Sequence, residues 1–223
     1  MLIIGIDDAG RGPLIGNMYL AGVLLKKEDE KSLKQEGVAD SKQLTHPNRI
    51  KLAGIIKDTC IDYKIAESTP NEIDHAVHTA GMNLNTLEAI KAAEIINYLT
   101  KGKKENIKII IDCPSINTKT WRETLISFIE KTDNLEVICE HKADVNHPSV
   151  SAASILAKVA REDSIEIIKK QYGDIGSGYP SDPTTKTFLK NKGSELKDSG
   201  IFRKSWATWK ALFPDAKQST LSI

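Results

Sequence analysis

The sequence contains few of the residues that mark secreted, zinc-binding or membrane-embedded proteins. It has only three cysteines, Cys60, Cys113 and Cys139, and their number and spacing fit neither a disulfide framework nor a zinc finger. No apolar stretch approaches the roughly 20 residues that a membrane-spanning helix requires. The apolar residues 2–6 run directly into charged and glycine-rich sequence, unlike a signal peptide. We therefore expect a reduced, cytoplasmic protein that makes no contact with a membrane.

Low-complexity sequence is also lacking, and the composition is that of a globular protein. The 223 residues are 40% hydrophobic and 27% charged, with aromatic residues at only 5%. The net charge of +1 hides an asymmetry, because residues 184–223 contain eight Lys or Arg and three Asp or Glu, a balance of +5 that leaves −4 for the rest. Such a division suits a polyanion held near an acidic, metal-binding centre. On charge alone, a solvated helical face is the simpler interpretation.

Hydrophobic periodicity predicts an α/β fold. Apolar runs predict strands at residues 2–6, 17–25, 60–66, 107–111 and 135–139, and helical spacing predicts helices at 28–35, 48–58, 81–100, 119–130 and 150–170. The last helix is entered through Pro148, with Ser149 as a candidate cap. This order predicts a mixed sheet with helices on both faces. After Gly173 the sequence becomes rich in glycine, proline and serine, so we expect a core at residues 1–172 and a helical C-terminal extension at 173–223 packed on it.

Four aspartates lie at or just beyond the ends of predicted strands. Asp7 and Asp8 follow the first strand, Asp112 follows the strand at 107–111, and Asp144 follows the strand at 135–139. Neighbouring strands could bring these carboxylates together, where they would repel one another unless divalent cations neutralise them. The alternative for Asp7 and Asp8 is an aspartate-rich turn satisfied by backbone amides.

The ligand types indicate which cation such a site would hold. Oxygen ligands without a His or Cys pattern favour Mg²⁺ or Mn²⁺ over Zn²⁺. Two such ions, roughly 4 Å apart, are suited to phosphodiester hydrolysis. His141 and His147 flank Asp144, but a surface or structural role is the better interpretation for both.

Several further residues are candidates for substrate binding. Glycines at 10 and 12 would let the backbone around Arg11 approach a sugar closely, although such loops are often only turns. Basic side chains could contact phosphates and a tyrosine could stack on a sugar or base. Each has an ordinary alternative, as a solvated lysine, a packing residue or an anchor for the tail. The candidates are Gly10, Arg11, Gly12, Lys42, Ser154, Lys158 and Tyr179.

Taken together, these segments resemble the ribonuclease HII family, the type 2 ribonucleases H. Six motifs occur in family order and cover most of the chain. They are Asp7-Asp8-Ala9-Gly10-Arg11-Gly12-Pro13, Asp40-Ser41-Lys42, Ile111-Asp112, Lys142-Ala143-Asp144, the stretch 150–158 and the stretch 176–183. The stretch 202–206 is more similar to the archaeal branch of the family than to the bacterial one.

The resemblance implies a ribonuclease H-like fold and a function. A family member would cut on the 5′ side of a ribonucleotide, in an RNA/DNA hybrid or singly embedded in duplex DNA, leaving 3′-hydroxyl and 5′-phosphate ends. By matched position, the four aspartates would be catalytic metal ligands. The Gly10-Arg11-Gly12 backbone would read the 2′-hydroxyl, Tyr179 would sense the junction beside the ribonucleotide, and Lys42 would hold a phosphate.

Two departures from the family pattern are visible. The second carboxylate is normally glutamate, and Asp8 is shorter by about one bond length, ~1.5 Å. Asn17 stands where proline is expected, which should not affect the chemistry. The alternatives are therefore a hybrid-binding module whose turnover the change at Asp8 has weakened, and a different polynucleotidyl transferase of the same broad fold. The second leaves two features unexplained: the glycine loop, Gly10-Arg11-Gly12, and the tyrosine loop, residues 176–183 around Tyr179.

The resemblance extends to one possible protein partner. Residues 218–223 are similar to the start of a sliding-clamp-binding peptide, but the aromatic pair that such peptides insert is missing, so a frayed tail is the preferred interpretation. Nothing in the sequence requires more than a monomer.

Overall fold

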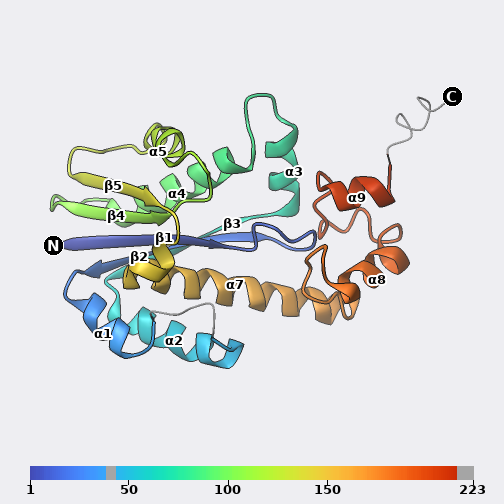
Figure 1. Ribbon diagram of the computed structural model, residues 1–223, viewed down its shortest axis with the longest axis horizontal. Helices are drawn as coiled ribbons and strands as arrows, with labels where there is room; N and C mark the ends of the chain where they lie inside the picture. Colours follow the sequence, from blue (N-terminus) through green and yellow to red (C-terminus); the bar gives the residue numbers. More distant parts are fainter. Residues whose placement is uncertain (39–43, 215–223) are drawn as a thin grey trace.

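A five-stranded mixed sheet forms the centre of the protein, in a computed structural model that describes residues 1–38 and 44–214 (Figure 1). The strand order is β3-β2-β1-β4-β5; β2 pairs antiparallel with both β1 and β3, whereas β4 pairs parallel with both β1 and β5. The strands are β1 (Leu2–Ala9), β2 (Met18–Lys26), β3 (Asp62–Ser68), β4 (Ile107–Asp112) and β5 (Leu135–Glu140). The predicted α/β class and all five predicted strands are confirmed.

Helices cover both faces of this sheet (Figure 1). One face carries α3 (Pro70–His78), α4 (Leu84–Thr100) and α5 (Thr118–Ile126), and the other carries α1 (Asp29–Gln35), α2 (His46–Thr59) and the long α7 (Pro148–Tyr172). A short helix, α6 (Ala143–Asn146), connects β5 to α7, and α8 (Pro183–Lys192) and α9 (Ala207–Leu212) follow α7. No helix among the described residues is long and apolar enough to cross a membrane.

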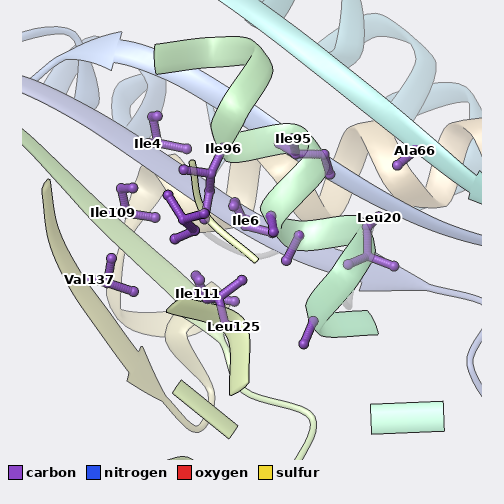
Figure 2. Close-up of a cluster of buried hydrophobic side chains, with 14 of the residues drawn as sticks. Ile4, Ile6, Leu20, Ala66, Ile95, Ile96, Ile109, Ile111, Leu125 and Val137 are labelled. Carbon is purple, nitrogen blue, oxygen red and sulfur yellow. The ribbon is translucent and has the colours of Figure 1, made fainter. Parts of the chain in front are cut away.

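Alternating side chains of β1 supply two separate hydrophobic layers. Ile4 and Ile6 pack with α4 and α5 on one face, as Figure 2 shows, whereas Ile3 packs with α7 on the other. Gly5 lies where α7 crosses β1, and a Cβ atom placed there would come within 2.1 Å of the Ser149 backbone. Glycine therefore allows the start of α7 to approach the strand that carries the first two aspartates.

A third hydrophobic cluster joins the C-terminal segment to the rest of the protein. Its buried members come from the loop after β1, from α7 and from the C-terminal segment: Leu14, Ile15, Ile165, Ile175, Phe188, Leu189, Ile201, Phe202 and Trp209. An isolated antiparallel bridge between Ile15 and Phe202 adds backbone pairing to this contact. The segment after α7 thus packs directly on the loop that follows the paired aspartates.

Three local details differ from the sequence predictions. The strand predicted to stop at residue 6 continues to Ala9, because Asp7, Asp8 and Ala9 pair with residues of β2. The prediction of Ser149 as a helix cap was wrong: Pro148 is already in the first turn, so His147 is the cap, and the Ser149 N–H donates to Glu30 Oε1 at 3.2 Å.

The third difference is α3, which the periodicity analysis did not predict. Its start carries a capping box, in which the Thr69 side chain accepts from the Glu72 N–H and the Glu72 carboxylate accepts from the Thr69 N–H. This pattern was the available signal for a helix here.

Candidate active site

Three of the four predicted aspartates meet at one edge of the sheet. Ile6 of β1 lies in register with Ile111 of parallel β4, so Asp7 and Asp112 are the next residues on adjacent strands. Asp144 reaches the same place from α6, directly after β5. One carboxylate oxygen from each of Asp7, Asp112 and Asp144 lies within 4.8 Å of the other two. This geometry brings together side chains that are more than 130 positions apart in the sequence.

Burial and mutual repulsion disfavour the charged form of this cluster when no cation is bound. Asp7 is only 7% exposed, and burial, followed by the neighbouring Asp8, raises its pKa to about 8, with Asp112 adding to the rise. Hydrogen bonds from the Ser154 side chain and the Asp8 N–H, the latter at 2.8 Å, partly offset these effects. Converging carboxylate oxygens with few counter-charges fit a hard divalent cation such as Mg²⁺ or Mn²⁺.

Asp8 lies beside this cluster and is not one of its three members. Adjacent residues of a strand point to opposite faces, so Asp8 is directed toward the α4 side while Asp7 is directed toward α7. Burial raises the pKa of Asp8 to about 6, although the nearby Arg11 favours the charged form. Asp8 and Asp112 remain close enough for their charges to interact.

A fifth acidic residue, Glu88 of α4, was not predicted from the sequence. Its side chain is 1% exposed, and burial together with the charge of Asp8 raises its pKa to about 8. The signal was available, because Glu88 is four residues after Leu84 on the apolar side of a predicted helix, where a charged side chain needs a reason.

That reason is the side chain of Arg11. Arg11 Nε lies 3.1 Å from Glu88 Oε1, and its terminal nitrogens donate to Asn85 Oδ1 at 2.6 Å and to the Pro114 carbonyl at 3.0 Å. The arginine of the glycine loop is therefore anchored on α4 and on the loop after β4. What the loop can offer a ligand is chiefly its backbone.

A groove of about 410 Å³ lies beside the aspartates and contains most of the predicted substrate-binding residues. It is lined by Asp8, Ala9, Gly10, Arg11, Gly12, Arg49, Lys158, Arg161, Glu162 and Tyr179. Besides Arg11, which is paired with Glu88, the lining has three cations, Arg49, Lys158 and Arg161, and this charge suits a polyanion. Arg49 was not predicted; it comes from α2 and donates to Glu162 Oε1 at 2.7 Å.

The tyrosine loop and the glycine loop lie side by side in this groove. A Cβ atom on Gly12 would lie 3.5 Å from the Tyr179 ring, and the Arg161 guanidinium stands 5.1 Å from the centre of that ring. Leu14 N–H donates to the Gly178 carbonyl at 2.8 Å, which ties the two loops together. The structure therefore brings Gly10-Arg11-Gly12 and Tyr179, separate candidates in the sequence, to one place.

The remaining candidates are placed as follows. Ser154 is fully buried, and its described partner is the Asp7 carboxylate. Lys42 and the tail at 218–223 lie outside the described residues. His141 lies 3.3 Å from the Cys113 carbonyl, and His147 lies 2.8 Å from Glu140 Oε1, contacts in keeping with structural roles.

Comparisons with known proteins agree with this arrangement. The family model for ribonuclease HII matches residues 4–209. A ribonuclease HII from Methanococcus maripaludis is 44% identical over 222 residues, which cover 99% of this chain and 90% of the relative. The crystal structure of the ribonuclease H2 from Pyrococcus horikoshii superimposes with a TM-score of 0.84 at 38% identity, covering 95% of this chain and 97% of the other.

A second solved structure shows a relative with a partner. It is the PCNA:RNase HII complex from Archaeoglobus fulgidus, with a TM-score of 0.80 and 35% identity, covering 92% of this chain and 95% of the matched one. Similarity of this extent leaves no large part of the described fold unmatched.

Proposed function

The chain belongs to the ribonuclease HII family, and from that premise we propose that it cuts the phosphodiester on the 5′ side of ribonucleotides, in RNA/DNA hybrids and where a single ribonucleotide is embedded in duplex DNA. It is a ribonuclease H-type endonuclease, a metal-dependent hydrolase. The products carry 3′-hydroxyl and 5′-phosphate ends. Such a reaction belongs to ribonucleotide excision and to DNA replication and repair.

The observation that carries the proposal is the convergence of Asp7, Asp112 and Asp144 beside a cation-lined groove. With Asp8 as the fourth ligand, these residues hold the divalent cations, Mg²⁺ or Mn²⁺. Two bound cations supply stabilisation of the attacking water and of the leaving oxygen. The ionised carboxylates provide the binding charge, and Ser154 orients Asp7 through its hydrogen bond.

The groove residues select the substrate. The backbone of Gly10, Arg11 and Gly12 reads the 2′-hydroxyl, which distinguishes a ribonucleotide from a deoxyribonucleotide. Tyr179 packs beside Gly12 and senses the junction that follows the ribonucleotide. Lys158 and Lys42 hold phosphates, whereas the buried Ser154 acts on the substrate only through the Asp7 carboxylate that it orients.

A cleavage assay on matched duplexes tests this function. One duplex holds a single ribonucleotide and the other has deoxyribonucleotide at the same position, each incubated with Mg²⁺, Mn²⁺ or EDTA. We expect one nick, in the first duplex only, and only with metal. A polymerase should extend the 3′ end, and a ligase should seal the 5′-phosphate end once the ribonucleotide has been replaced. Asp7→Asn should bind the duplex and leave it uncut.

Each rival interpretation makes a different prediction in the same assay. A module with abolished turnover binds the hybrid without cutting it, and a different polynucleotidyl transferase cuts both duplexes equally. Neither the structure nor the comparisons support the first alternative. Absence of a nick with both metals would reject the proposed activity.

Binding of a sliding clamp is a separate proposal about partners. Its support is that the Archaeoglobus relative is seen in complex with PCNA. Comparing clamp binding by the full chain with binding by a chain ending at residue 217 tests whether the tail at 218–223 carries the contact. We take the working form of the enzyme to be a cytoplasmic monomer.

A further inference from the structure

Two side chains of one short C-terminal stretch donate hydrogen bonds to all three carbonyls of the glycine loop. The Arg203 side chain donates to the Gly10 carbonyl at 2.6 Å and to the Arg11 carbonyl at 2.7 Å, and Trp206 Nε1 donates to the Gly12 carbonyl at 3.1 Å. The three acceptors are consecutive, and both donors come from a stretch nearly 200 positions later in the sequence.

Arg203 is a buried cation whose described hydrogen bonds all go to backbone carbonyls. Its side chain is 0% exposed, and besides the two bonds above it donates twice to the Gly16 carbonyl, at 3.0 and 2.8 Å. Burying a guanidinium is costly, and an apolar side chain of similar volume would fill the space without that cost. What the guanidinium adds is a rigid fork of donors that fixes the course of the loop at both of its ends.

The donor segment is itself held in place from another element. Asp74 of α3 accepts hydrogen bonds from the Lys204 N–H at 2.7 Å, from the Ser205 N–H at 2.9 Å and from the Ser205 hydroxyl at 2.5 Å. The Arg203 guanidinium also stands 5.1 Å from the centre of the Trp206 ring. These contacts fix the segment on the body of the protein, so its donors form a rigid template.

The direction of these bonds determines which backbone groups face the groove. In a trans peptide the C=O and the following N–H point in opposite directions, and the described residues contain no cis peptide. Because the carbonyls of Gly10 and Arg11 point at Arg203, the N–H groups of Arg11 and Gly12 point away from it. Both residues line the groove.

We propose that Arg203 and Trp206 are positioning residues for ribonucleotide recognition, which hold the backbone of Gly10, Arg11 and Gly12 so that its N–H groups meet the sugar. The proposal rests on the proposed function, since it concerns how the same loop selects its substrate. Residues 203–206 thereby determine specificity without contacting the substrate.

Trp206→Phe is the sharpest test, because it removes one donor and keeps an aromatic ring. The measurements are KM and kcat for the duplex with one ribonucleotide and the inhibition constant of the all-DNA duplex. We expect KM to rise about fivefold, the effect of one lost hydrogen bond, with kcat and the inhibition constant little changed. Arg203→Lys, which keeps the charge and loses the forked donors, should lower the preference for the ribonucleotide-containing duplex over the all-DNA duplex further.

A second readout does not depend on activity. Hydrogen–deuterium exchange of a peptide covering residues 9–17 should be faster in Trp206→Phe than in the unaltered protein. Asp198→Asn is the matched control, because Asp198 pairs with Lys204 Nζ at 3.3 Å on the exposed side of the same segment. This control should change neither exchange nor preference.

The outcomes separate this proposal from the proposed function. If Trp206→Phe raises KM and the inhibition constant together, or leaves both at their original values, the positioning role is overturned. If the unaltered protein nicks neither duplex, the proposed function fails. In that case unchanged exchange in Trp206→Phe would still overturn the coupling between segment and loop, and faster exchange would support it. Should Arg203→Lys fail to fold, Trp206→Phe alone decides.

Discussion

Asp8 is the residue at which this chain departs most clearly from its family. It stands where the ribonuclease HII pattern has glutamate, and it lies beside the cluster of Asp7, Asp112 and Asp144 without belonging to it. An added methylene would extend its carboxylate by about 1.5 Å, a length comparable to one carbon–carbon bond. Under the proposed function, the shorter side chain should therefore hold cations less closely than glutamate would.

From this we predict that Asp8→Glu increases cation affinity, so that the Mg²⁺ concentration giving half-maximal cleavage falls severalfold. Asp8→Asn, which removes the charge and keeps the length, should raise that concentration. Titrating Mg²⁺ in the cleavage assay measures both. If Asp8→Glu requires as much Mg²⁺ as the unaltered protein, or more, the prediction is wrong and the site is built around aspartate.

A second prediction concerns pH in the metal-free protein. Asp7 has a folded pKa of about 8, above its ordinary value of 3.8, and Asp8 and Glu88 are raised in the same direction. Between these values the folded state binds more protons than the unfolded state, so stability is greatest at the acid end and is lost as the pH rises toward 8. In EDTA, these groups should lower the melting temperature steadily from pH 5 to pH 8.

Cation binding reverses this trend, because it requires the ionised carboxylates. Mg²⁺ should therefore raise the melting temperature more at pH 8 than at pH 5. Asp7→Asn removes the main titrating group, so its metal-free melting curve should depend less on pH. Differential scanning calorimetry with and without Mg²⁺ measures all four conditions. Parallel pH profiles for Asp7→Asn and the unaltered protein would show that Asp7 is not the main source of the pH dependence.

At the scale of single residues, the sequence predicted the clustered aspartates but not the residues that pair with or position their neighbours. Asp7, Asp112 and Asp144 could be found because each follows an apolar run, and neighbouring strands bring their ends together. Glu88 was missed although its place on the apolar side of a predicted helix was an available signal, and Arg203 gave no signal. Arg203 in particular binds backbone carbonyls, which leave no trace in residue types.

At the scale of helices and strands, apolar runs located the strands and helical spacing located the long helix. The strands of the sheet and the helix at 150–170 were predicted within a few residues. The end of β1 was wrong because pairing with β2 continues through charged residues, which a search for apolar runs does not follow. Helix α3 was missed because its signal is the capping box of Thr69 and Glu72, which a search for apolar repeats does not detect.

The crossing of α7 over β1 gives a third prediction. Gly5→Ala would place a Cβ atom within 2.4 Å of three backbone atoms of Ser149 and Val150, which cannot move without shifting α7. We expect a loss of about 3 kcal/mol in the free energy of unfolding, as for an overpacked core, and weaker cation binding because α6 and Asp144 precede this helix.

Gly54→Ala is the matched control for this change. Gly54 is an exposed residue inside α2 with nothing within 4 Å of a Cβ atom, so alanine there should stabilise the protein by up to about 1 kcal/mol through helix propensity. Urea unfolding compares the two variants. Equal stability of Gly5→Ala and the unaltered protein would show that α7 can move away from the strand without cost.

Considered as a whole, the molecule packs its C-terminal segment against the glycine loop. The sequence predicted a core at 1–172 and an extension at 173–223, and a change in composition was enough to suggest that boundary. It could not show that both parts share one hydrophobic cluster, in which Ile15 and Ile165 pack with Phe202. Because of that cluster and the hydrogen bonds of Arg203, the conformation of the glycine loop depends on both parts.

Shared packing of this kind predicts that the two parts unfold together. Separate unfolding would expose Leu14, Ile15 and Ile165 to water and leave the carbonyls around Gly10 without the donors of Arg203, so an intermediate with only the core folded is disfavoured. Calorimetry should show one cooperative transition. Phe202→Ala, which truncates a side chain that is 1% exposed, should lower the midpoint of that single transition by the equivalent of about 3–5 kcal/mol. An early, separate transition in Phe202→Ala would instead mean that the extension folds and unfolds on its own, and that the shared cluster does not couple it to the core.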